Sequence, residues 1–345
     1  EFGDGTSPKV GVLWGITPDF RMRASYGQSF RAPSLMEIDP TSAIFNTQLF
    51  PVLNVTVPLV SFSGPASDLA AETSDTYTLG FDYGGARDSG VYLSATYFSI
   101  DYQDRIAAGP TSAALANPAA WPDVIYTSSS VDVIEALLRA STPNFNDLGV
   151  DLSDLRVAAQ NFAAMPGLTI LDVRSRNLAL SQLDGLDLRA GYRSSESWGQ
   201  WEVGFTASQM FDYREQTTPS APVNTVVDTV ARPVDLRARA FANVSAGRIN
   251  ATLSVNYVDD YSNPFAVGGA QEVESWTTAD LSVAYAFGVP THGYRLTLSI
   301  QNLTDEMPPF VGLGAGGILR TRVGFDPMNA NPLGRLIVLG VTKRW

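Results

Sequence analysis

The chain of 345 residues contains no cysteine, and His292 is its only histidine. The absence of cysteine excludes disulfides, thiolate catalysis and cysteine metal sites together. A zinc site or a Ser-His-Asp triad would have to use the one imidazole. We interpret His292 as a solvated turn residue. We therefore expect a protein that is not an enzyme, with no catalytic residue, metal site or cofactor.

Charge is also scarce, because only 17% of the residues are charged and the formal net charge is −12. Nucleic acid requires a basic surface, so the acidic balance argues against nucleic acid as a partner. Although 45% of the residues are hydrophobic, no apolar run reaches the roughly 18 residues of a transmembrane helix. Composition therefore excludes a nucleic-acid binder and a helical membrane span.

Hydrophobic and polar residues instead alternate with a period of two, which is the pattern of a β-strand with two different faces. The pattern is clearest at residues 20–31, where Phe20, Met22 and Tyr26 share one face and Arg21, Arg23 and Arg31 share the other. Pro33 follows soon after and cannot donate to a ladder, so the strand ends in a loop. Eleven segments show the alternation: residues 10–16, 20–31, 77–83, 91–100, 186–192, 201–211, 234–243, 249–257, 281–287, 294–301 and 335–345.

The connections alternate between short turns and long polar loops. The long loops lie near residues 32–74, 104–172, 214–231, 260–274 and 304–332. Brief turns on one side and long loops on the other are typical of outer-membrane β-barrels, whose long loops are extracellular. Aromatic residues gather near the short turns, as in a membrane-interface girdle, among them Tyr83, Tyr92, Tyr192, Trp201 and Tyr294. A soluble β-sandwich is the alternative, but its strands are shorter and its loops do not sort by parity.

An odd number of strands is unexpected, because single-chain bacterial barrels have even numbers. An open sheet would also leave an unpaired edge in lipid. The sequence starts at Glu1 without a methionine or a signal-peptide pattern. We therefore expect the C-terminal part of a larger transmembrane antiparallel β-barrel.

Four segments resemble the TonB-dependent outer-membrane receptors. Residues 29–37 (SFRAPSLME) are similar to a mid-barrel signature of that family, and residues 71–80 (AETSDTYTLG) to a second one. Residues 300–306 (IQNLTDE) and the closing strand through Lys343 to Trp345 resemble the end of the barrel. The resemblance implies a barrel of twenty-two strands, so that residues 1–345 form part of one barrel domain without its plug.

The resemblance also implies a function and partners. These are active uptake across the outer membrane of a Gram-negative bacterium, energised by TonB acting through a plug that this sequence lacks, with outer-membrane lipid around the barrel and the barrel-assembly machinery recognising Trp345. The expected ligand is a ferric siderophore. Uptake of an oligosaccharide or of cobalamin, or a passive pore without energy coupling, are the alternatives.

Two groups of residues are candidates for ligand binding. Arginines that we expect on the lumen face, Arg237 and Arg239 among them, could bind an anionic ligand, or could pair with lumen carboxylates or the plug. Loop aromatics could line a vestibule, or could pack the loops against each other; they include Phe45, Phe50, Trp121, Tyr126, Tyr261 and Phe265.

The longest loop shows helical periodicity. Val131, Ile134, Leu137 and Leu138 are spaced for one face of a short helix over residues 131–140, and residues 148–165 could form a second helix. Loops of this length with their own structure are usually functional, so we expect a lid or a ligand-capture element. The pair Asp259 and Asp260 offers oxygen ligands for calcium, but its spacing matches no EF-hand and we interpret it as solvated.

Overall fold

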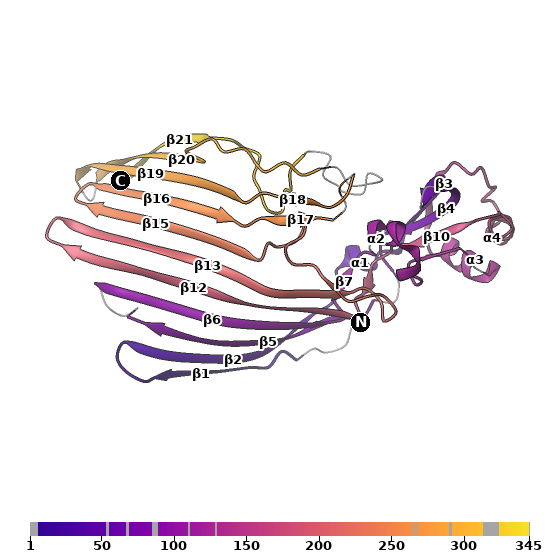
Figure 1. The fold of residues 1–345 in the computed structure, drawn as a ribbon, viewed down its shortest axis with the longest axis horizontal. Helices are drawn as coiled ribbons and strands as arrows, with labels where there is room; N and C mark the ends of the chain where they lie inside the picture. The colour runs from indigo at the N-terminus through magenta and orange to yellow at the C-terminus, as the bar shows by residue number, and fades with distance from the viewer. Residues whose placement is uncertain are drawn as a thin grey trace.

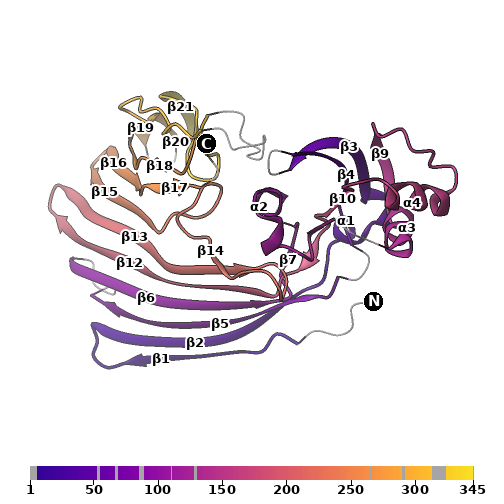
Figure 2. The same cartoon turned by 45° about the vertical axis from the view of Figure 1, so that its right-hand side comes forward.

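The computed structural model describes residues 6–52, 55–66, 69–84, 89–109, 111–127, 130–264, 266, 268–289, 292–312 and 324–344. Its largest feature is one antiparallel sheet with the strand order β1-β2-β5-β6-β12-β13-β15-β16-β19-β20-β21. Figure 1 shows these strands side by side, and Figure 2 shows that the sheet is curved and open. The strands are β1 (Lys9–Gly15), β2 (Phe20–Arg31), β5 (Glu72–Tyr83), β6 (Gly90–Gln103), β12 (Leu180–Glu196), β13 (Gly199–Gln216), β15 (Leu236–Ala246), β16 (Ile249–Val258), β19 (Trp276–Val289), β20 (His292–Gln301) and β21 (Leu336–Arg344).

All eleven predicted segments are strands of this sheet, and the prediction of an antiparallel all-β barrel fold is confirmed. The pairing is continuous, with one bulge between β12 and β13 at Asp184 and Gly185. A short strand, β14 (Asn224–Thr225), also pairs with β13. None of the helices in the described ranges has the length and hydropathy needed to cross a bilayer.

The register sorts the side chains onto an apolar face and a polar face. One row across the apolar face is Trp14, Met22, Phe81, Ala95, Leu188, Ala207, Ala238 and Tyr257. Trp14 is 62% exposed and Leu339 is 68% exposed, although both are large and hydrophobic. Exposed apolar side chains over a whole sheet are the outer surface of a membrane barrel, where lipid is the solvent.

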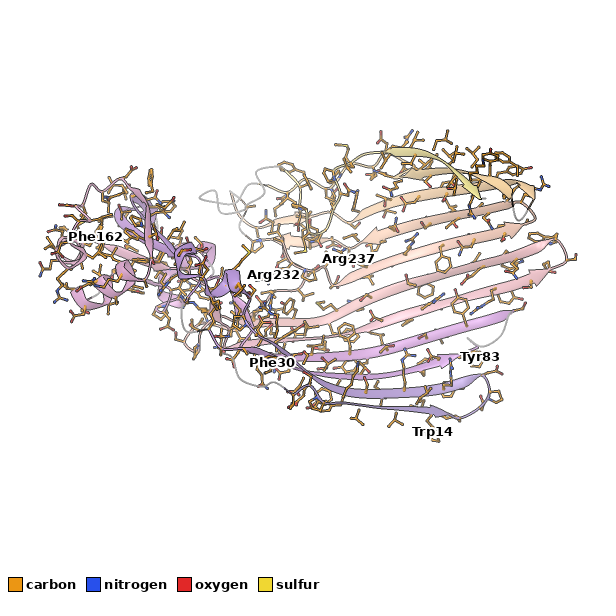
Figure 3. The ribbon with its side chains drawn as sticks, turned by 180° about the vertical axis from the view of Figure 1, so that it is seen from behind. Trp14, Phe30, Tyr83, Phe162, Arg232 and Arg237 are labelled. Atoms are coloured by element: carbon orange, nitrogen blue, oxygen red, sulfur yellow. The ribbon has the colours of Figure 1, made fainter. Side chains whose placement is uncertain are left out.

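The two ends of the sheet differ. Turns join β1 to β2, β12 to β13 and β15 to β16 at one end, which we call the short-turn end (Figure 1). The chain makes long excursions at the opposite end, which we call the loop end. Figure 3 shows Tyr83 and Trp14 toward the short-turn end and Phe30, Arg232 and Arg237 toward the loop end. Short turns and long excursions therefore lie at opposite ends of the sheet.

The first two long loops fold together into a unit that the sequence did not predict. Its five-stranded sheet has the order β8-β10-β4-β3-β9 and lies beyond the loop end of the main sheet (Figures 1 and 2). We call this unit the loop domain. Its elements are β3 (Ile44–Val52), β4 (Val55–Ser63), α2 (Thr111–Ala116), η2 (Pro118–Ala120), β8 (Ile125–Tyr126), α3 (Val131–Arg139), β9 (Thr142–Asn146), α4 (Leu155–Ala163) and β10 (Thr169–Asp172).

Each face of the small sheet carries its own hydrophobic core. Helices α3 and α4 cover one face, and Phe45, Phe62 and Phe162 are fully buried there. Trp121 and Leu171 belong to the core on the other face. Helix α3 confirms the helix predicted over residues 131–140, and α4 lies within the second predicted helical segment. Because hydrophobic cores cover both faces of its sheet, the loop domain is ordered although its two loops are polar.

A narrow neck joins the loop domain to the main sheet. Strand β7 (Ile106–Ala107) pairs with β11 (Arg176–Asn177), so the chain enters and leaves at one place. The side chain of Asn177 donates to the carbonyl oxygens of Ala70 and Asp104 and accepts from the Ala70 amide at 2.8 Å. One carboxamide therefore ties together the ends of both loops.

The later loops form a third, smaller core. It contains Val230, Tyr261 and Val273, close to the hairpin of β17 (Tyr261–Asn263) and β18 (Gln271–Val273). The buried carboxylate of Asp326 accepts hydrogen bonds from the amides of Ala231 and Met328 at 2.8 and 2.9 Å. This carboxylate fixes the segment at 326–333 against the loop that precedes β15.

Candidate ligand-binding groove

The arginines of the polar face fall into two classes. Arg23 forms an ion pair with Asp82 at 2.5 Å, and Arg189 approaches Glu202 at 3.8 Å, as the pairing alternative predicts. Arg237 and Arg239 differ, because no described carboxylate lies within 4.0 Å of either guanidinium group. Arg237 donates to Asn329 Oδ1 and Arg239 donates to Ser254 Oγ at 2.9 Å. Within the described residues, neither guanidinium group is therefore held in an ion pair.

These two side chains line a hollow of about 430 Å³ on the polar face. We call it the arginine groove. Arg189 and Asp187 contribute from β12, so the lining carries three guanidinium groups and one carboxylate. A second hollow of about 390 Å³ shares Arg189 and Arg239 and continues toward the short-turn end past Glu202. The arrangement suits an anion, since a net positive wall attracts negative charge and guanidinium groups form bidentate bonds with planar oxyanions.

Tyr92 corrects one prediction from the sequence. We expected it in the aromatic girdle, but Tyr92 lies on the polar face, where only 4% of the residue is exposed. Its hydroxyl donates to Glu202 Oε1 at 2.6 Å, and the guanidinium carbons of Arg189 and Arg193 lie 5.2 and 5.0 Å from its ring centre. The ring packs where Gly191 on β12 leaves room, and it lies beside Arg189, which lines the arginine groove.

The loop aromatics are placed mainly in cores. Phe45, Trp121 and Tyr261 are 0%, 5% and 3% exposed, while Phe50 and Tyr126 pack against the two cores of the loop domain. Phe265 lies outside the described residues. These positions favour the alternative in which the aromatics pack the loops, and their contact with a ligand stays a prediction. Sequence periodicity did not separate them from surface aromatics, because their partners come from distant loops.

The segment 29–37 forms a clasp at the loop end. Arg31 donates two hydrogen bonds of 2.6 Å to the carboxylate of Glu72 and two of 2.9 and 3.0 Å to that of Glu37. Glu72 also accepts the Ile106 amide at 2.7 Å. Arg31 therefore joins the start of the first long loop, its end and the start of the second. The two resembling segments, 29–37 and 71–80, are connected physically through this one side chain.

The remaining sequence candidates are not brought into the groove. Asp259 accepts hydrogen bonds from its own neighbours, Tyr257 and the Asp260 amide, and no group of three or more potential metal ligands occurs in the described part of the chain. His292 begins β20 at the short-turn end, away from the groove. Trp345 lies outside the described residues.

Comparison with known families decides the relationship. The family model described as TonB dependent receptor-like, beta-barrel matches residues 1–303. The chain belongs to this family. The family that the sequence resemblance predicted is thereby confirmed. Members are transport receptors of the outer membrane and not enzymes. The polar face of a barrel of this family lines the lumen, so we call the polar face of this sheet the lumen face.

Solved structures of similar fold include siderophore receptors. The ferric enterobactin receptor PfeA of Pseudomonas aeruginosa, in complex with BCV-L6, has a TM-score of 0.61 at 15% identity, over 99% of this chain and 40% of that chain. The siderophore receptor PirA of Acinetobacter baumannii has a TM-score of 0.56 at 16% identity, over 97% and 40%. At such identities the likeness shows the fold alone. This chain spans about 40% of the length of these receptors, and no curated protein matches it.

Proposed function

We propose that this chain is the ligand-facing wall of a TonB-energised importer of the outer membrane of a Gram-negative bacterium, and that its cargo is a ferric siderophore. The observation that carries the proposal is the arginine groove on the lumen face, in which Arg237 and Arg239 have no described carboxylate partner. An unneutralised cationic groove beside the long loops suits an anionic cargo that enters from outside. Solved siderophore receptors of the same fold support this choice.

The expected mechanism changes no bond in the cargo. The cargo first contacts the extracellular loops, and the loop domain acts as a capture element at the mouth. It then reaches the lumen wall, where guanidinium groups replace some of the water around its negative charge. TonB acts through a plug outside this sequence to open the path, and outer-membrane lipid surrounds the wall. Assembly of the barrel is proposed to use the C-terminal aromatic, Trp345.

Paired substitutions in the full-length protein test the role of the groove. We expect Arg237→Gln with Arg239→Gln to weaken binding of a ferric catecholate siderophore by at least tenfold, because both charges are lost. Arg295→Gln is the matched control, since Arg295 shares the lumen face on β20 but does not line the groove. Equal binding by the double variant and the control would refute the anionic cargo site.

A passive pore is the competing function. It predicts solute entry that continues when the proton gradient is collapsed, whereas an energised importer stops. The comparison requires only intact cells, a labelled cargo and an uncoupler.

A further inference from the structure

Three aromatic rings form a flat patch on the apolar face of the main sheet, at the short-turn end of β19, β20 and β21. The ring centres of Phe287 and Tyr294 lie 5.4 Å apart with 18° between the ring planes, and those of Tyr285 and Phe287 lie 6.4 Å apart with 24° between them. Each of the three residues is between 41% and 44% exposed. We call Tyr285, Phe287, Tyr294 and the neighbouring Lys343 the aromatic shelf.

The strand register arranges the shelf in two rows. Phe287 pairs with Tyr294, and Tyr294 pairs with Lys343, so these three side chains form a row close to the turn between β19 and β20. The next row, toward the middle of the strands, consists of Tyr285, Leu296 and Val341. A row that carries a charge and a hydroxyl group therefore lies beside a mainly apolar row, as the head of a lipid lies beside its chains.

Lys343 shows at which depth of the bilayer the shelf lies. Its Nζ atom is 5.8 Å from the ring centre of Tyr294, within the range of a cation–π contact. An ammonium group is costly in hydrocarbon, so lysine side chains near the ends of membrane-spanning segments extend toward the headgroups. Aromatic rings prefer the same depth. The shelf therefore belongs at the headgroup level of one leaflet.

The two ends of the sheet show which leaflet the shelf meets. The shelf lies at the short-turn end, whereas the loop domain lies beyond the opposite end (Figures 1 and 2). In outer-membrane barrels the short turns are periplasmic and the long loops are extracellular. The shelf therefore faces the periplasmic leaflet.

Charge at the shelf is positive. Lys343 is the one charged residue among the six residues of the two rows, all of which the structure describes. An anionic group is its complement, and their attraction is stronger at the edge of the hydrocarbon than in water because the local dielectric constant is lower. The partner must also be apolar beside its charge, since the second row is mainly hydrocarbon. A phospholipid combines a phosphate with acyl chains in this way.

We propose that the aromatic shelf binds the phosphate of a phospholipid in the periplasmic leaflet. The phosphate accepts hydrogen bonds from Lys343 Nζ and from the hydroxyl of Tyr294. The glycerol backbone packs on the rings of Phe287 and Tyr285, and the acyl chains continue over the second row. The inference rests on the proposed function only in that the barrel lies in the outer membrane with its long loops outside.

The test uses the full-length protein, refolded in detergent and selected by its compact band on gels. Native mass spectrometry measures the binding of phosphatidylglycerol and of diacylglycerol, which has the same chains and no phosphate. The variants are Lys343→Gln, Lys343→Arg and Trp201→Leu. Trp201 is the matched control, because its ring centre lies 5.4 Å from that of Tyr192 in another aromatic pair at the short-turn end, whose row neighbours are Ser194 and Val244.

We expect Lys343→Gln to weaken phosphatidylglycerol binding about fivefold, because one lysine near a charged membrane surface contributes about 1 kcal/mol. Lys343→Arg keeps the positive charge and should bind as wild type does. Trp201→Leu should leave phosphatidylglycerol binding unchanged, and diacylglycerol should bind wild type and Lys343→Gln equally. Equal phosphatidylglycerol binding by wild type and Lys343→Gln, or a loss that Lys343→Arg shares, overturns the proposal.

Two further ligands separate the sources of the phosphate. Displacement of phosphatidylglycerol by inorganic phosphate would show a site for the free anion and would overturn a lipid site. Binding of lipopolysaccharide that depends on Lys343 as strongly would overturn the assignment to the periplasmic leaflet.

Uptake of a ferric catecholate by cells carrying the same variants separates this inference from the proposed function. If wild type accumulates the cargo while Lys343→Gln binds phosphatidylglycerol as wild type does, the shelf is wrong and the importer stands. If Lys343→Gln weakens lipid binding while wild type accumulates no cargo, the importer is wrong and the shelf stands.

Discussion

Tyr92 packs on the lumen wall over Gly191, and we call this packing site the Tyr92 socket. It offers a sharp test of how the lumen wall is built. A Cβ at Gly191 would lie 2.3 Å from Tyr92 Oη and 2.5 Å from Cζ. Carbon and oxygen atoms cannot approach so closely, so Gly191→Ala must push the ring off the wall. The ring would lose its burial and its 2.6 Å hydrogen bond to Glu202.

The magnitude follows from these two losses. Overpacking costs about 1–3 kcal/mol, and a hydrogen bond to a charged acceptor contributes about 1.5–3 kcal/mol. The Cβ that Gly191→Ala adds would also lie 2.5 Å from the carbonyl oxygen of Val203. The control substitution must therefore create a similar clash with a backbone carbonyl. Gly80→Ala does, because its Cβ would lie 2.5 Å from the Ala95 carbonyl. We therefore expect Gly191→Ala to lower the free energy of unfolding by about 3 kcal/mol more than Gly80→Ala.

The assay is guanidinium titration of the full-length protein refolded into lipid vesicles, followed by tryptophan fluorescence and by the compact band on gels. The same pair of substitutions is then made in a Tyr92→Ala background, where no ring remains to be displaced. There the difference between Gly191→Ala and Gly80→Ala should disappear. Equal midpoints in the wild-type background, or a difference that survives the loss of Tyr92, would refute the socket.

Three further predictions concern the loops. Arg31→Ala should speed proteolysis within residues 32–74, because Glu37 and Glu72 lose their shared partner. Arg31 holds the pKa of Glu37 at about 2, so the clasp is intact above about pH 4.5 and weakens as pH falls from there toward 2. Burial and the nearby Asp235 raise the pKa of Asp228 to about 6. The contribution of Asp228 to stability should thus be largest below about pH 4 and fall as pH rises from there to about 6, by less than about 1 kcal/mol after solvent screening. Asp228→Asn should flatten that slope in thermal melts. Removal of residues 44–63 together with 110–172 should leave a folded barrel with weakened cargo binding, and unchanged cargo affinity in this deletion would contradict a capture role. Removal of 110–165 alone should cause aggregation, because it uncovers Phe45 and Phe62.

The strands of the main sheet could be predicted because their alternation of apolar and polar residues is local in the sequence. Each strand pairs with the strand before or after it in the order of the main sheet. Lipid on one face and a polar lumen on the other impose a strict alternation of apolar and polar side chains with a period of two. Residues 91–100 show the limit of this signal. Tyr92 and Tyr97 lie on opposite faces, so residue type alone did not reveal which aromatic faces the lumen.

The loop domain could not be predicted, because its pairing is not local. Ile170 pairs with Val60 in parallel, and Asn146 of β9 pairs with Thr47. Short segments such as β10, which is buried on every residue, carry no alternation to mark them as strands. Helix α3 could be predicted because the spacing of Ile134, Leu137 and Leu138 places them on one helical face, independently of what that face packs against.

Only part of the candidate site could be predicted from the sequence. Sequence parity placed Arg237 and Arg239 on the lumen face. It did not show that Asp82 and Glu202 pair with other arginines, and that these two have no carboxylate partner among the described residues.

Energised import is the central claim, and uptake of a labelled ferric catecholate by whole cells tests it most directly. Cells carrying the full-length gene are compared with the gene deletion, with a strain lacking TonB, and with wild type treated with an uncoupler. The account predicts accumulation in wild type alone. Accumulation that is equal with and without TonB, and insensitive to the uncoupler, would contradict it.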